Sequence, residues 1–200
     1  MLSKLGNDHL LIGKRRNYPR IDWKILEAHS DGLICLTGSA GGILGQLIST
    51  RKIDQAKEVA KRLKDIFGEN LGLEIEPNNL VKLENNYSDY QDQRLVNNQV
   101  IKFGKELNIK IVPTNNAHFL NKEDYEAHDV FIAMGAGMPV KFGNRPKYTE
   151  DFYCKSEDEV RAFFGRLYPD QVDEWINNTT FFADQCEEPA WIDPKFSNPS

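Results

Sequence analysis

The sequence GLICLTGSAGG at residues 32–42 joins a short apolar run to a glycine-rich turn. The run at residues 32–37 is continuously apolar, which is typical of a strand buried on both faces of a parallel sheet. No Lys-Ser/Thr pair follows the glycines, and their spacing is not that of a dinucleotide-binding fingerprint, which argues against a phosphate-binding loop. We therefore interpret them as a tight turn that leaves a buried strand.

Downstream of this turn, helical and strand patterns alternate. Residues 53–67 carry apolar side chains at three- and four-residue spacings, with Asp54 near the start and Gly68 just past the end, which predicts an amphipathic helix. The pattern then predicts a second strand at 71–75, a polar loop around 84–88, a helix whose apolar residues lie at 95–107, and a third strand at 109–113.

The last part of the chain is helical in pattern, with helices predicted at 122–134, 156–167 and 169–186. We expect an α/β domain with parallel strands over residues 1–134, a mostly helical C-terminal annex of the same domain over 135–188, and a proline-punctuated tail over 189–200. Three strands are too few for a closed eight-stranded barrel, which takes about 250 residues. The sheet is therefore open, or part of a barrel is missing.

Charge and composition exclude several classes of protein. A net charge of -5 argues against autonomous DNA binding, because a module that grips phosphates by itself needs a basic surface. The basic cluster Lys14-Arg15-Arg16 with Arg20 is expected to be a solvated loop. No stretch approaches the roughly 18 apolar residues of a membrane helix, and residues 1–12 lack the apolar core of a signal peptide. We therefore expect a cytoplasmic protein.

Polar side chains cluster where the third predicted strand ends, in Thr114-Asn115-Asn116-Ala117-His118. Functional residues favour the carboxyl ends of strands in parallel sheets and barrels. At the end of the second strand, Glu74 and Glu76 lie two residues apart, and therefore on one face if the strand runs that far, so an acid/base pair is geometrically possible there. A packing or salt-bridge role for these two glutamates is the commoner alternative.

Five strings in one order and with similar spacings resemble the PHP domain, in its C-terminal half, of bacterial-type DNA polymerase III alpha subunits. The strings are residues 19–23 and 29–34 leading to Leu36-Thr37-Gly38-Ser39, residues 67–70 with 73–75, residues 112–120, residues 124–129, and residues 152–156 with Glu159. The closing Pro194-Lys195-Phe196 is similar to that domain's exit toward the polymerase palm. The resemblance covers nearly the whole chain.

The resemblance implies part of a PHP-type distorted (β/α)7 barrel with parallel strands, followed by the helical annex. The earlier strands of that barrel have no counterpart here, so the chain looks truncated relative to the family. The palm, with the three aspartates that the family uses for polymerization, would begin after Ser200. Because a half barrel would leave strand edges unpaired, we expect either a partner chain or a rearranged sheet.

The resemblance also implies a metal site. Active family members hold divalent metals at the barrel mouth through histidines and carboxylates, and these metals activate water for phosphoester cleavage. Ser39 stands at a cysteine ligand position, Asn116 at an aspartate position, and His118 at a histidine position. Serine and the neutral amide are poorer ligands than thiolate and carboxylate, and each replacement removes a negative charge that would balance the metal.

We therefore expect a degenerate site with no catalytic residue and no required cofactor. Zinc or manganese are the metals that a residual site at His118 would take. The alternative for His118 is a hydrogen-bonded structural histidine at the strand end. His128 matches a family position that packs and caps the structure, so we expect a structural role for it as well.

Three functions are compatible with the sequence. The first is a structural and interaction scaffold in DNA replication, within a cellular or phage replicative polymerase. Its partner is then the rest of the polymerase, and it contacts DNA only indirectly. This function predicts a hydrophobic interface on the barrel rim. The second is a metal-dependent phosphoesterase or 3'-5' exonuclease whose missing ligands come from another chain that completes the barrel. The third is a free-standing interaction module. Each implies the cytoplasm, or the host cytoplasm for a phage protein, and no membrane.

Overall fold

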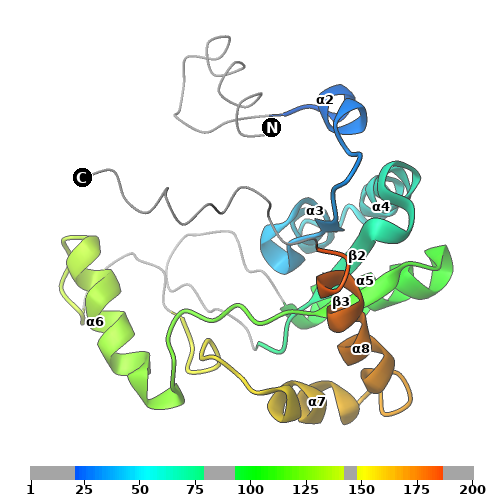
Figure 1. The fold of residues 1–200 in the computed structure, drawn as a ribbon. Helices are drawn as coiled ribbons and strands as arrows, with labels where there is room; N and C mark the ends of the chain where they lie inside the picture. The colour runs from blue at the N-terminus through cyan, green and yellow to red at the C-terminus, as the bar shows by residue number, and fades with distance from the viewer. Residues whose placement is uncertain (1–20, 79–92, 142–147, 187–200) are drawn as a thin grey trace, which may run out of the picture.

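The centre of the structure is a parallel sheet of three strands in the order β1-β2-β3. The computed structural model describes residues 21–78, 93–141 and 148–186 (Figure 1). The strands are β1 (Cys35–Leu36), β2 (Leu71–Ile75) and β3 (Lys110–Pro113). Cys35 pairs with Leu71, and Gly72 pairs with Lys110. Because all three strands run in the same direction, their carboxyl ends lie at one edge of the sheet.

Helices cover this sheet and carry most of the remaining core. They are α2 (Trp23–Ala28), α3 (Ile43–Ser49), α4 (Ile53–Phe67), α5 (Gln93–Leu107), α6 (Tyr125–Gly135), α7 (Glu157–Gly165) and α8 (Val172–Ala183), with single 3-10 turns η1 (Ser39–Gly41), η2 (Gly68–Asn70) and η3 (Lys122–Asp124). α5 packs on β2, α8 packs on β3, and α3 packs against α4 and α5. Figure 1 shows α6 apart from the sheet, at the far end of the segment that leaves β3.

The predicted alternation of strands and helices is confirmed. α4 and β2 have the predicted bounds, and β3 begins one residue later than expected. α6, α7 and α8 fall in the three predicted helical regions, although Lys122–Asp124 forms a 3-10 turn before α6. The described residues form an open sheet of three strands and no closed barrel. Among their helices, none has both the length and the apolar character needed to cross a bilayer.

The first strand is shorter than predicted, and a helix follows it that the pattern analysis missed. Gly32 adopts φ 70°, and the Leu33 amide donates to the Ser30 carbonyl at 3.1 Å, so residues 30–33 form a turn before β1. After the turn, α3 occupies residues for which no element had been predicted. Its signal was present, because Leu44 and Ile48 are four residues apart and both are buried.

The glycine-rich segment turns tightly, as its interpretation required. Gly38 has φ 75°, a left-handed conformation that side chains with a Cβ rarely adopt. A Cβ on Gly42 would lie 1.9 Å from the Thr37 carbonyl oxygen. The absence of side chains at these two positions therefore lets the chain reverse directly from β1 into α3.

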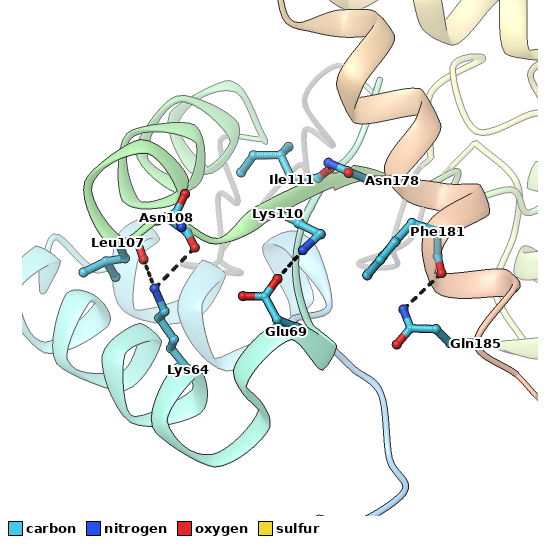
Figure 2. Close-up of polar contacts among 9 residues, drawn as sticks. All are labelled: Lys64, Glu69, Leu107, Asn108, Lys110, Ile111, Asn178, Phe181 and Gln185. Atoms are coloured by element: carbon cyan, nitrogen blue, oxygen red, sulfur yellow. Dashed lines mark hydrogen bonds and ion pairs between the residues drawn. The ribbon is translucent and has the colours of Figure 1, made fainter.

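α8 covers the outer edge of β3, which is one of the edges expected to lack a partner. The Asn178 side-chain amide donates to the Ile111 carbonyl at 2.9 Å, and Asn178 is only 8% exposed (Figure 2). Nearby, Lys110 pairs with Glu69, and Lys64 donates to the carbonyl of Asn108 at 3.3 Å. A side chain from the annex thus takes the place of part of a neighbouring strand.

Several predicted features lie outside the described residues. They are the polar loop around 84–88, the basic cluster at 14–20 and the tail at 189–200 with its Pro194-Lys195-Phe196 motif.

Candidate functional site

The polar residues at the carboxyl edge of the sheet form the candidate site. Thr37 and Gly38 follow β1, Glu76 follows β2, and Asn116 lies three residues beyond the end of β3. This edge is the usual place for ligands in open α/β sheets, because the loops that leave neighbouring strands meet there.

Glu74 joins the ends of β1 and β2. Its main-chain amide donates to the Thr37 hydroxyl at 3.0 Å, and its carboxylate accepts a short hydrogen bond from the Gly38 amide. The same carboxylate disfavours charge on a neighbouring thiol: burial first, and then Glu74, raise the pKa of Cys35 to about 11. Cys35 is therefore a protonated packing residue at neutral pH.

Ser39 takes part in a buried network of neutral side chains. The Gln93 amide donates to the Ser39 hydroxyl at 2.8 Å and to the Asn97 side-chain oxygen at 2.7 Å. Asn97 in turn bonds both main-chain groups of Glu76, accepting from its amide at 3.2 Å and donating to its carbonyl at 2.8 Å. Ser39, Gln93 and Asn97 are 2%, 6% and 5% exposed. Satisfied networks of this kind hold elements in one arrangement.

Gln93 and Asn97 were missed by the sequence analysis. Both lie on the inward face of α5, in register with the apolar residues Val96 and Val100. Polar side chains at buried helical positions, four residues apart, were the signal that could have found them.

Glu76 is the titratable group of the site. Burial, and secondarily the charge of Glu74, raise the pKa of Glu76 to about 7, while a hydrogen bond from Asn116 opposes this rise. The two glutamates are therefore close enough to interact, as their spacing on the strand allowed. Asn116 contacts a carboxylate here, although it stands at a family ligand position.

His118 lies among aromatic rings. Its ring centroid is 4.1 Å from that of Tyr148, 5.6 Å from that of Phe152 and 5.7 Å from that of His128. Its main-chain amide donates to the Phe152 carbonyl at 2.8 Å. Burial, followed by the neighbouring His128, lowers the pKa of His118, so the ring is neutral at physiological pH.

The structure thus places the three family ligand positions in different settings. Ser39 is hydrogen-bonded to Gln93, Asn116 is hydrogen-bonded to Glu76, and the His118 ring lies against the Tyr148 ring at a tilt of 37°. Within the described ranges, no three side chains of the His, Cys, Asp or Glu type converge as a metal cluster.

Comparison with known proteins agrees with the motifs. The family model described as PHP domain matches residues 3–78. The chain is 32% identical to DNA polymerase III subunit alpha of Borreliella burgdorferi over 171 residues, which are 85% of this chain and 14% of that protein. It is 31% identical to the Campylobacter jejuni subunit over 180 residues (84% and 14%), and 34% identical to the Aquifex aeolicus subunit over 140 residues (70% and 11%).

The chain therefore spans about one seventh of the length of these curated relatives. The residues that carry the likeness include the turn after β1 and the strand β2, both of which lie in the range matched by the family model. Over most of its length, this chain is therefore homologous to the PHP region of the DNA polymerase III alpha subunits.

Proposed function

We propose that this chain acts in DNA replication as the PHP segment of a replicative polymerase alpha subunit, in a structural role and with a degenerate metal site. Its partners are then the remaining parts of the polymerase, and it meets DNA only through them. The setting is the cytoplasm, or the host cytoplasm if a phage encodes the protein. The relatives supply the replication context, because they are named as alpha subunits of DNA polymerase III.

The observation that carries the structural role is the use of Ser39. The Ser39 hydroxyl accepts a hydrogen bond from Gln93 and is buried, so this side chain contributes to a network of neutral groups. The network continues through Asn97 to the main chain of Glu76, and so joins η1, α5 and the end of β2 without any ionised group. We infer that hydrogen bonds hold this edge together where active relatives use metal.

The enzyme alternative is a metal-dependent phosphoesterase or 3'-5' exonuclease completed by another chain. One observation favours it: Asn116 contacts the Glu76 carboxyl, whose raised pKa would suit proton transfer near neutral pH. The ligands missing here would have to come from the partner. Hydrolysis of a phosphodiester substrate, gained with zinc or manganese when the two chains are mixed and lost with His118→Ala, would support this alternative.

Metal content and thermal stability distinguish the two functions. We expect the purified chain to hold well under one zinc or manganese ion per molecule. A metal that binds only the folded state would stabilise it, so without bound metal the melting temperature should be the same with and without chelator. The His118→Ala variant serves as a control and should give the same chelator response as the unsubstituted chain. One tightly held metal per chain, with a clear loss of stability on chelation, would overturn the structural role.

A further inference from the structure

α6 exposes apolar side chains along one face. Val130, Phe131 and Met134 are 42%, 72% and 73% exposed, and Ala127 is exposed on the same face. The spacing 127, 130, 131, 134 is the i, i+3, i+4, i+7 pattern by which a helix contacts a partner. We refer to these four residues as the α6 face. Soluble proteins rarely expose contiguous apolar patches unless the patch is an interaction site.

The inward side of α6 is already occupied. The ring centroid of His128 lies 5.2 Å from that of Phe119 and 5.3 Å from that of Tyr148. Ala133, on the same helix, is 1% exposed. These contacts attach the helix to the segment that follows β3, away from the main sheet (Figure 1). α6 is therefore held in place by one side while it presents a second apolar side outward, within the part of the chain that the structure describes.

The relatives indicate what covers this face. The Borreliella burgdorferi match spans 85% of the chain, which leaves about 15% of the 200 residues, or 30, outside it. A continuous match of that extent must include α6, at residues 125–135. In that alpha subunit the matched segment is 14% of the protein, so about six sevenths of the polypeptide lie outside it. Polymerase polypeptide is thus the partner that accompanies this helix in the relatives.

The sheet edge offers this partner less than α6 does. On the outer side of β3, the Ile111 carbonyl already accepts a hydrogen bond from Asn178 of α8. The largest exposed side chains of α6, Phe131 and Met134, are apolar and lie on the same exposed face of the helix. Contacts there would bury apolar area without the need to pair main-chain groups.

We propose that the α6 face is the surface on which polypeptide of the alpha subunit outside the matched segment docks, through an apolar surface of its own. This inference rests on the proposed function and deepens it, because it identifies the helix that makes the contact. The aromatic Phe131 at the centre of the face is the expected anchor, since large aromatic side chains dominate the energetics of interfaces.

Site-specific crosslinking in the protein's own cells tests the contact. The affinity-tagged protein carries Phe131→p-benzoylphenylalanine, and the adducts formed on irradiation are identified by mass spectrometry. The control is Leu167→p-benzoylphenylalanine, because Leu167 is 73% exposed, nearly the same as Phe131, but follows α7. We expect adducts between position 131 and alpha-subunit sequence outside the matched segment, and no such adducts from position 167. Adducts between position 131 and alpha-subunit sequence on the same polypeptide support the inference equally.

A pair of charge variants supplies the second readout. The measured quantity is the amount of alpha-subunit polypeptide that copurifies with the tagged protein. We expect Phe131→Glu to lower this amount by about tenfold or more, and Leu167→Glu to leave it within about twofold. Both positions are exposed, so both variants should keep the melting temperature of the unsubstituted chain. If alpha-subunit polypeptide is recovered and crosslinks elsewhere, or if position 131 crosslinks only to a second copy of α6, the inference is wrong while the proposed function stands. If the unsubstituted protein recovers no alpha-subunit polypeptide, the inference and the proposed function are both wrong.

Discussion

Neutral side chains occupy two positions at the carboxyl edge of the sheet. Ser39 has a hydroxyl that accepts a hydrogen bond from Gln93. Asn116 keeps an amide that stabilises the ionised form of Glu76. Both residues are neutral, so the negative charge at this edge belongs to Glu74 and Glu76, which repel each other. Hydrogen bonding and partial protonation of Glu76 relieve that repulsion.

The Ser39 hydroxyl is expected to matter for stability. Ser39→Ala leaves a buried Gln93 donor without its partner, which should lower the free energy of unfolding by about 1–2 kcal/mol. Ser49→Ala is the matched control, because the Ser49 hydroxyl is buried without a hydrogen-bond partner among the described residues. That control should be neutral or slightly stabilising. Urea unfolding of both variants measures the difference, and equal effects would contradict the role given to Gln93.

Glu76 should make stability depend on pH. Its folded pKa is about 7, above the ordinary value of 4.5, so the folded state binds the proton more tightly than the unfolded state. The stabilisation is full below pH 4.5 and is lost as the pH rises through 7. After allowance for solvent screening, we expect a loss of about 1–2 kcal/mol between pH 5 and pH 8.

Urea unfolding at the two pH values checks this expectation. Glu76→Gln cannot titrate and should remove that part of the pH dependence. Glu126→Gln, at an exposed position on α6, should retain the slope of the unsubstituted chain. A Glu76→Gln variant with an unchanged slope would show that another group is responsible.

At the level of elements, α5 and α8 supply buried polar side chains that their apolar patterns alone do not indicate. α5 buries Gln93 and Asn97 together with its apolar residues, and these two amides connect η1 to the end of β2. α8 buries Trp175 and Ile176 in the core and also directs Asn178 at β3. Each helix therefore contributes hydrogen bonds to the sheet as well as apolar contacts.

Asn178 allows a direct test of how the β3 edge is held. Asn178→Ala removes the donor to the buried Ile111 carbonyl, and we expect the free energy of unfolding to fall by about 1–3 kcal/mol. The neighbouring residue supplies the control: Asn177 is exposed, and Asn177→Ala should change stability by less than about 0.5 kcal/mol. Chemical denaturation distinguishes the two, and a neutral Asn178→Ala would mean that apolar packing of α8 alone secures the edge.

On the scale of the whole molecule, the described residues form one packed part and one projecting part. The apolar cores of α3, α4, α5, α7 and α8 meet the sheet in one cluster. α6 stands outside that cluster, attached through the aromatic contacts of His128. This arrangement satisfies the sheet edge at β3 within the chain and leaves apolar surface on α6 for a partner.

Local patterns in the sequence were sufficient to predict the strand and helix alternation, including β2 and α4 with their bounds, because periodicity and end signals act over a few residues. They also placed the polar cluster that contains Asn116 at the carboxyl end of the third strand, whereas Ser39 was singled out only by the resemblance to the PHP family. Only the tertiary structure decided that Gln93 binds Ser39, that His118 lies against Tyr148, that Asn178 covers β3, and that the α6 face points outward. Each of these depends on residues far apart in the chain, whose meeting is set by packing and not by local pattern.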